Sequence, residues 1–249
     1  MLGLPDGIRA CLFDMDGVLT RTATVHMAAW KRTFDEFLLG RDPDARAFDQ
    51  ADYNRFVDGK PRADGVRDFL ASRDIALPEG SADDGPDAET VQGIGNRKNE
   101  LLLAELDEHG VEVYPGSLRY LQAVKDAGLV TAVVTASANG AQVVEAAGFG
   151  HLLDARVDGV TTAEQGLRGK PAPDSFLAGA RALGVAAAQA VVFEDALSGV
   201  EAGRAGNFGF VVGVDRVGQA DALAEHGADR VVADLAELLD DDTMGEQNA

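Results

Sequence analysis

The hydrophobic pattern divides the chain into two kinds of segment. Short apolar runs of strand length occur at residues 10–13 and again from residue 129 onward, where they alternate with helical stretches. From about residue 22 to 107, apolar residues instead recur at spacings of three to four, as in amphipathic helices. Alternating strands and helices predict a parallel sheet with helices on both faces. We therefore expect an α/β domain with a small helical domain inserted after its first strand.

Turn and cap residues set the expected limits of these elements. The domains are expected to span residues 1–21 with 108–249, and residues 22–107. Within the inserted domain we predict helices beginning near residue 22 and over 65–72 and 96–108, with polar or Pro/Gly-rich connections over 40–52 and 77–95. In the α/β domain, strands are predicted at 10–13, 129–134, 155–160, 190–193, 208–214 and from 230, and helices up to 127, over 140–147, up to 183 and over 197–205. Ser117 and Asp174 are the expected N-caps of two of these helices.

Two aspartates, Asp14 and Asp16, follow the first strand directly. Open α/β sheets bind ligands at the carboxyl ends of their strands, and residues i and i+2 point to the same side. Two carboxylates that close raise each other's pKa unless a cation intervenes or one is protonated. The pair therefore indicates a divalent metal, an acid/base role, or both. The structural alternative is a simple Asp-Gly turn made with Gly17.

Polar residues of complementary kinds follow two other strands. Thr135 and Ser137 end one of them, and Glu194 and Asp195 end another. Parallel strands bring these ends to one edge, where Asp14, Glu194 and Asp195 would form the oxygen-only ligand set that Mg²⁺ prefers. Lys170, in a Pro-rich loop before a helix, supplies a compact positive charge suited to a phosphoryl group. Taken alone, Lys170 is equally well a solvated surface residue.

Composition and charge exclude several classes of partner. The formal charge is −20, so nucleic acid and anionic membranes are not expected partners, because phosphate backbones require a basic surface. The chain shows no apolar run of membrane-spanning length and no signal-peptide core in its first residues. The single cysteine, Cys11, suits a reducing compartment. We expect a cytoplasmic protein that acts as a monomer.

Together, the run Phe13-Asp14-Met15-Asp16-Gly17-Val18, the strand end at Thr135, the segment Lys170-Pro171-Ala172-Pro173 and the pair Glu194-Asp195 resemble the four motifs of the haloacid dehalogenase superfamily of phosphotransferases. The resemblance spans nearly the whole chain, in the expected order. It implies a Rossmann-like parallel sheet core with an inserted α-helical cap domain. Asp16 resembles the acid/base residue that the phosphotransferases carry and true dehalogenases lack.

Within this superfamily, the chain resembles the β-phosphoglucomutase family most. The similarity implies that Asp14, Asp16, Thr135 and Lys170 are catalytic and that Mg²⁺ is held by Asp14, Asp16, Glu194 and Asp195. It further implies that a phosphorylated sugar is bound by Thr22, His26, Trp30, Gly59, Arg62, Lys98, Ala136, Ser137 and Asn139. Two positions depart from the family pattern, because Asp58 and Ala138 stand where the family carries lysines. Both fall among groups that would hold the sugar or its distal phosphate.

The resemblance implies a phosphomutase that interconverts β-D-glucose 1-phosphate and glucose 6-phosphate through an aspartyl phosphate. A Mg²⁺-dependent sugar-phosphate phosphatase with the same core is the alternative. On the residues alone, Trp30 reads as a cap core residue, while Arg62 is equally well a solvated helix-start cation and His26 equally well a surface residue of an amphipathic helix. A non-catalytic binding module of the same fold is a third reading, but it would have no need for both aspartates, the Glu194-Asp195 pair and Lys170.

Overall fold

The computed structural model describes residues 2–239 and divides the chain into two compact units. The first unit, here called the core, comprises Met1–Arg21 and Glu112–Ala249, and the second, the cap, comprises Thr22–Val111. The sequence-based limits of the α/β domain include residues 1 and 240–249, which lie outside the described residues. No helix within residues 2–239 is long and apolar enough to cross a membrane.

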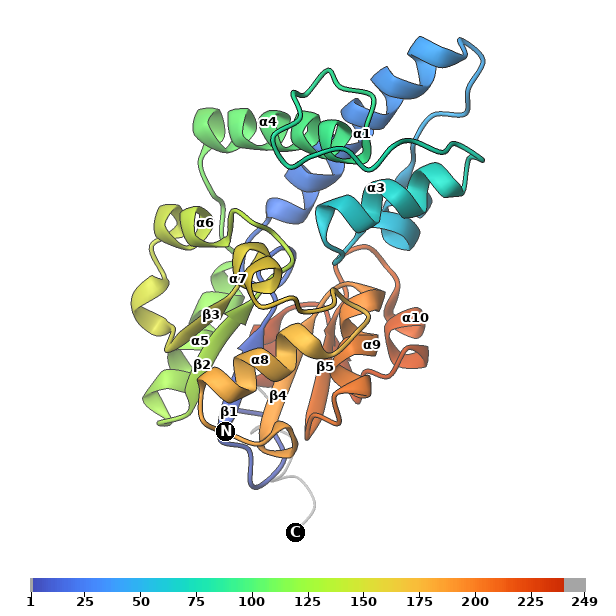
Figure 1. The fold of residues 1–249 in the computed structure, drawn as a ribbon. Coiled ribbons are helices and arrows are strands. Elements are labelled where there is room, and N and C mark those ends of the chain that lie inside the picture. Colours follow the sequence, from blue (N-terminus) through green and yellow to red (C-terminus); the bar gives the residue numbers. More distant parts are fainter. Residues whose placement is uncertain (1, 240–249) are drawn as a thin grey trace. The chain divides into compact units, whose positions relative to one another are not determined.

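The core is built on one parallel sheet with the strand order β3-β2-β1-β4-β5-β6 (Figure 1). The first strand, β1, lies between β2 and β4, and Phe13 pairs with Val133 on one side and Phe193 on the other. The predicted fold class, an α/β protein with a Rossmann-like sheet and an inserted helical cap, is confirmed. The strands are β1 (Ala10–Phe13), β2 (Val130–Val134), β3 (Ala155–Val157), β4 (Ala190–Glu194), β5 (Phe210–Val214) and β6 (Arg230–Val232).

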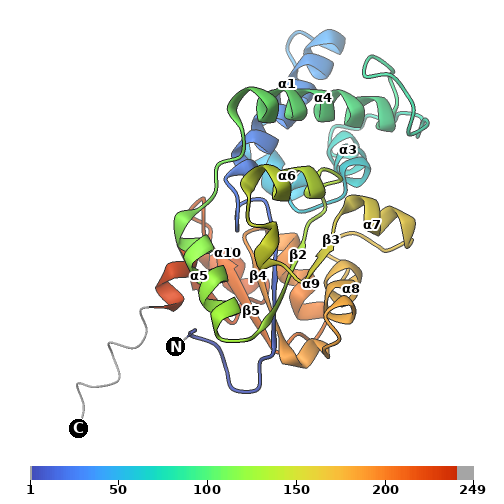
Figure 2. The ribbon, with the colours of Figure 1, turned by 90° about the vertical axis from the view of Figure 1, so that its left-hand side faces the viewer.

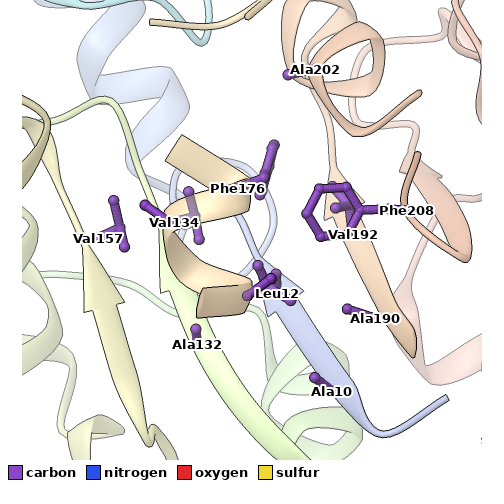
Figure 3. Close-up of a cluster of buried hydrophobic side chains, with 12 residues drawn as sticks. Ala10, Leu12, Ala132, Val134, Val157, Phe176, Ala190, Val192, Ala202 and Phe208 are labelled. Carbon is purple, nitrogen blue, oxygen red and sulfur yellow. The ribbon is translucent and has the colours of Figure 1, made fainter. Parts of the chain in front are cut away.

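Helices cover both faces of this sheet, because successive side chains of each buried strand point to opposite faces. Leu12, Val134 and Val192 join Phe176 of α8 in one buried cluster (Figure 3). Figure 2 shows α5 on the side of the sheet opposite α8, where Phe13 stacks on Phe193 at 4.5 Å between ring centroids. The core helices are α5 (Pro115–Asp126), α6 (Gly140–Ala147), α7 (Gly159–Glu164), α8 (Asp174–Ala182), α9 (Leu197–Ala205) and α10 (Ala220–Glu225), with 3-10 turns at Gly150–Leu152, Ala187–Gln189 and Leu235–Leu238.

The cap is an all-helical unit with its own aromatic core. Phe34 is fully buried, with ring centroids 5.0 Å from Trp30, 5.1 Å from Phe48 and 4.1 Å from Phe69. Trp30 is therefore a cap core residue, as its sequence pattern indicated. The cap helices are α1 (Thr22–Arg41), α2 (Gln50–Asp52), the π-helical turn η1 (Tyr53–Val57), α3 (Arg62–Ala71) and α4 (Val91–His109).

Several predicted limits in the cap are wrong for identifiable reasons. The helix expected over 96–108 begins at Val91, because the Thr90 side chain accepts a hydrogen bond from the Gly93 N–H and caps the helix earlier. The polar stretch expected over 40–52 ends in helix, since Asp49 and Asp52 form a reciprocal capping box that starts α2.

Three limits in the core also differ from prediction. Ser117 does not cap α5, since Pro115 occupies the first turn and the helix begins there. Asp174 is the first residue of α8 and pairs with Arg168 at 2.9 Å. Val160 lies in α7, not in a strand, because Asp158 accepts from the Thr161 N–H and starts a helix. Helix α10 was not predicted.

Replacing Phe34 by Ala should lower the free energy of unfolding of the cap by about 3–5 kcal/mol, because removing a fully buried ring leaves a cavity. Leu39→Ala, on the same helix but half exposed, should change it by less than about 0.5 kcal/mol. Urea unfolding followed through the fluorescence of Trp30, the single tryptophan of the chain, measures both. Equal losses in the two variants would contradict the placement of Phe34 at the centre of the cap.

Candidate active site

The candidate site is built on the turn that follows β1. The Asp14 N–H donates to the Phe193 carbonyl at 2.9 Å, which continues the strand pairing to the first aspartate. The chain then turns at Gly17, whose φ of +87° favours glycine, and its N–H donates to the Thr20 carbonyl at 2.8 Å. A Cβ at Gly17 would overlap with the Asp195 carboxylate, so this turn passes directly against the end of β4.

Lys170 joins two strand ends through buried ion pairs. Its Nζ donates to Asp14 Oδ1 at 2.5 Å and to Glu194 Oε1 at 2.5 Å, and lies 3.4 Å from the Val134 carbonyl. The ammonium also lies 4.8 Å from the ring centroid of Phe176, in the first turns of α8. The other Glu194 oxygen accepts from the Ala196 N–H at 2.8 Å. Lys170 is therefore not a solvated surface residue, because its side chain is only 1% exposed.

Burial sets the electrostatics of this group of charges. Burial raises the pKa of the Asp14 carboxyl well above its ordinary value, and Glu194 and Asp16 raise it further, while Lys170 opposes them. Burial would lower the pKa of Lys170, but the carboxylates of Asp14 and Glu194 outweigh it and raise that pKa. Lys170 is thus held in its charged form, whereas burial and the neighbouring carboxylates favour the neutral form of Asp14.

Asp14, Glu194 and Asp195 form a buried cluster with the composition of a metal site. Each offers a carboxylate oxygen within 4.8 Å of those of the other two. All are oxygen ligands, the type that hard divalent cations bind. Lys170 balances only one of the three carboxylates, so all three can be ionised together in this buried place only if a further positive charge, such as that of a divalent cation, is added. The cluster therefore fits a hard divalent cation held by these three residues.

Asp16 has a different setting from Asp14. It is partly exposed, and its Oδ2 accepts a hydrogen bond from Thr135 Oγ1 at 3.2 Å, so the ends of β1 and β2 meet through these side chains. Thr135 Oγ1 in turn accepts from the Ser137 N–H at 3.1 Å. Ser137 Oγ accepts from the Asn139 N–H at 3.2 Å, and the Ser137 carbonyl accepts from the Gly159 N–H at 2.9 Å. The segment 135–139, which includes Ala136, is a hydrogen-bonded turn beside the acid/base candidate.

In the cap, one group of candidate residues lies together on α1 and α4. Lys98 Nζ lies 3.0 Å from His26 Nδ1 and 5.2 Å from the ring centroid of Trp30. Lys98 is buried and His26 is itself partly buried, so His26 is not a fully solvated surface residue. This group combines a cation, an imidazole and an aromatic ring.

The other cap candidates lie around the start of α3. Arg62 is the first residue of that helix and its side chain lies against Gly95 of α4, where burial lowers its pKa. Gly59 has a φ of +69°, and Thr22, the first residue of α1, is buried. Lys60, next to Gly59, donates to Asp68 at 2.7 Å.

The structure therefore brings Asp14, Asp16, Thr135, Lys170, Glu194 and Asp195 into one connected group in the core. Sequence reasoning missed two further residues that touch the same turns, Arg216 and Gln219, which follow β5. Their sequence setting resembles any surface loop, so no local signal could have found them.

Comparison with known proteins agrees with this site. A model of the haloacid dehalogenase-like hydrolases matches residues 8–207. The chain is 56% identical over 247 residues to a β-phosphoglucomutase of Mycobacterium bovis, an alignment that covers 96% of this chain and 94% of the relative. It is 30% identical over 239 residues to the validoxylamine A 7'-phosphate phosphatase of Streptomyces hygroscopicus, with 92% and 95% covered.

Among solved structures, a β-phosphoglucomutase from Clostridium difficile superposes with a TM-score of 0.75 at 25% identity, over 93% of each chain. The resemblance drawn from the motifs and the prediction of an enzyme, a phosphomutase or a phosphatase, are confirmed by these similarities. With its family model matched over most of its length, the chain belongs to the haloacid dehalogenase-like hydrolases.

Proposed function

We propose that this protein is a phosphotransferase of the β-phosphoglucomutase type, which interconverts β-D-glucose 1-phosphate and glucose 6-phosphate through an aspartyl phosphate. The observation that carries the chemistry is the contrast between two neighbouring carboxylates. Asp14 is buried and forms an ion pair with Lys170, whereas Asp16 is partly exposed and accepts a hydrogen bond from Thr135. Because the environments of the two carboxylates differ, one can act as nucleophile while the other transfers protons. The sugar substrate is inferred from the 56% identity to a β-phosphoglucomutase.

In the first step, a carboxylate oxygen of Asp14 attacks the phosphorus atom of a phosphate ester. The O–P bond to Asp14 forms as the bond from phosphorus to the leaving oxygen breaks, and Asp16 donates its proton to that oxygen. Lys170 keeps the Asp14 carboxylate oriented and places positive charge beside the transferring group. The Thr135 hydroxyl holds Asp16 toward the reacting atoms.

In the second step, a free hydroxyl of a sugar monophosphate attacks the phosphorus of the aspartyl phosphate, which gives a sugar bisphosphate; Asp14 then takes the other phosphate of that bisphosphate by the first step. Asp16, now a carboxylate, accepts the proton of that hydroxyl, and Asp14 is released as the leaving group. The same residue thus serves as acid and then as base. Transfer between two positions of one sugar requires a bisphosphate that is held while it changes orientation.

Mg²⁺ is the cofactor that we propose for the acidic cluster, held by Asp14, Glu194 and Asp195 together with the main-chain carbonyl of Asp16. When bound, it would neutralise negative charge on the transferring phosphoryl group. The cluster supports this choice because its donors are all oxygens and its charge is incompletely balanced by Lys170.

Recognition of the sugar phosphate is assigned to two groups of residues. Arg62 would bind the phosphate that is not transferred, since a guanidinium grips two phosphate oxygens at once. Ala136, Ser137 and Asn139 would contact the substrate from the turn beside Asp16, and the remaining contacts are assigned to residues of the cap, namely Thr22, His26, Trp30, Gly59 and Lys98.

We also propose a cytoplasmic location, because Cys11, the lone cysteine, suits a reducing compartment. A monomeric state stays a prediction.

A Mg²⁺-dependent sugar-phosphate phosphatase is the second candidate, and one observation favours it. Asp58 and Ala138 replace lysines of the β-phosphoglucomutase pattern, and the neighbouring Lys60 is engaged with Asp68 on α3. Weaker retention of a bisphosphate would let water take the phosphoryl group. The 30% identical Streptomyces relative is a phosphatase, which makes this outcome chemically accessible to the fold.

Asp14→Asn should lower turnover by at least about 10³-fold and abolish labelling by an acyl phosphate, because an amide cannot form the phosphoryl ester. Asp16→Asn should lower turnover of a sugar phosphate by about 10²–10⁴-fold but keep the labelling, since the carboxylate that leaves an acyl phosphate needs no proton. Intact-protein mass spectrometry measures the label. A labelled Asp14→Asn protein would refute the nucleophile.

Adding Mg²⁺ in about 100-fold excess over its Kd should raise the melting temperature of the protein by about 5–10 °C, because binding to the folded state adds about 2.7 kcal/mol. Asp195→Asn should lose most of this rise. Asp44→Asn, an exposed acid in the cap, should keep it. Scanning calorimetry with and without Mg²⁺ makes the comparison, and an equal rise in both variants would argue against the acidic cluster as the metal site.

Arg62→Ala should lower conversion of β-D-glucose 1-phosphate to glucose 6-phosphate by about 100-fold, because it removes a forked, charge-assisted contact. Phosphate release from p-nitrophenyl phosphate, which has no second phosphate, should stay within about 3-fold of the native rate. Arg67→Ala, on the same helix but paired with Glu79, is the matched control and should leave both rates unchanged. If the native protein releases phosphate from glucose 1-phosphate without forming glucose 6-phosphate, the phosphatase replaces the mutase.

A further inference from the structure

The loop that follows β5, residues 215–219, contacts two turns of the candidate site. One turn carries Asp16 and the other carries Asp195, and they come from strands β1 and β4. The loop reaches them with two side chains, Arg216 and Gln219. None of the superfamily motifs identified in the sequence includes this loop.

Arg216 binds the main chain just after Asp16. Its Nε donates to the Gly17 carbonyl at 2.7 Å, and a terminal nitrogen lies 3.4 Å from the Val18 carbonyl. The other terminal nitrogen donates to the Ala233 carbonyl at 2.7 Å, next to β6. The Arg216 side chain is 13% exposed, and its guanidinium stacks on Tyr114 with its central carbon 3.6 Å from the ring centroid. These contacts join the turn after β1 to the end of β6, the edge strand of the sheet.

Gln219 binds the turn that carries Asp195. Its side-chain N–H donates to the Asp195 carbonyl at 3.0 Å. The loop itself is held rigid, because Asp215 Oδ1 accepts from three main-chain N–H groups, at 3.2 Å from Val217, 2.7 Å from Gly218 and 2.9 Å from Gln219. A single rigid loop therefore fixes the peptide beside Asp16 and the peptide of Asp195 relative to each other.

We propose that Arg216 and Gln219 are positioning residues for phosphoryl transfer: Arg216 sets the place of the acid/base carboxylate of Asp16, and Gln219 sets the place of the Asp195 ligand. This inference rests on the roles proposed above for Asp16 and Asp195. The contact at Gly17 explains why the two positions must be set together, since the turn after β1 passes directly against the Asp195 carboxylate. Asp14 is held separately by Lys170 and by the Phe193 carbonyl, so the nucleophile does not depend on this loop.

The expected effect depends on the leaving group. A misplaced Asp16 fails to protonate an alkoxide, whereas a weakly basic phenolate leaves without a proton. In Arg216→Met, the single-turnover rate at which glucose 6-phosphate phosphorylates Asp14 should fall by about 10- to 100-fold, and the corresponding rate with p-nitrophenyl phosphate by less than about 3-fold. A general loss of structure would lower both rates alike.

Three further variants serve as a reference, a conservative substitution and a control for this comparison. Asp16→Asn is the reference and should show the same selective loss more strongly. Arg216→Lys keeps the charge but lacks the fork, and should give an intermediate ratio of the two rates. Arg204→Met removes a core arginine paired with Asp229 and should leave the ratio unchanged. If Arg216→Met does not fold, Arg216→Lys carries the test.

The outcomes distinguish a failure of the positioning role from a failure of the proposed function. If Asp16→Asn is selective and neither Arg216 variant is, the positioning role is wrong and the proposed function stands. If Asp16→Asn itself lowers both rates equally, the acid/base assignment fails and the positioning role fails with it. A selective loss in the Arg216 variants supports the inference.

Gln219 is tested without reference to activity. Gln219→Ala should raise the Mg²⁺ concentration needed for half of the metal-induced rise in melting temperature by about 10-fold, as loss of a contact behind a metal ligand does. Gln122→Ala, which removes an exposed side-chain bond to Asp126 on α5, is the control and should leave that concentration unchanged. Equal Mg²⁺ titrations for Gln219→Ala and the native protein would overturn the role of Gln219.

Discussion

The buried ammonium of Lys170 between Asp14 and Glu194 is the interaction on which the rest of the site depends. All three side chains lie out of water, so none of these charges is solvated and each needs the others. Removing one partner of such a group leaves an uncompensated buried charge, which typically costs about 3–5 kcal/mol. The group also ties β1, β4 and the segment before α8 together. The contacts proposed to act in catalysis are thus the same contacts that hold these strands together.

The sheet order explains why these charges meet where they do. Successive strands run outward from β1 on one side through β2 and β3, and on the other side through β4, β5 and β6. The order reverses between β1 and β4, and open α/β sheets bind ligands at the carboxyl ends of the strands at such a point. Apolar alternation along β1 sends Leu12 and Phe13 to opposite faces of the sheet, and the same strand then ends in Asp14. Packing of the core therefore places Asp14, the proposed nucleophile, at the carboxyl end of the central strand β1.

Core and cap contribute different parts of the proposed chemistry. In the proposed function, the core supplies the groups that act on the phosphoryl group, whichever molecule carries it. The cap supplies residues suited to the rest of a substrate, with Lys98, His26 and Trp30 in one cluster and Arg62 at the start of α3. Relatives that share this fold include a mutase and a phosphatase. Such a division is expected when one catalytic scaffold serves several substrates, since function lies in the site and not in the fold.

The sequence by itself determined the strand over residues 10–13, the alternation of strands and helices, and the residues that end the central strands, because hydrophobic period and motif chemistry are local properties. It did not determine where α4 begins or that α7 and α10 exist, since a single capping side chain or a short helix leaves little periodic signal. Only the tertiary structure brought Arg216 and Gln219 to the turns of β1 and β4. Their partners are main-chain carbonyls, which every residue carries, so nothing in the order of side chains marks such a contact before the chain has folded.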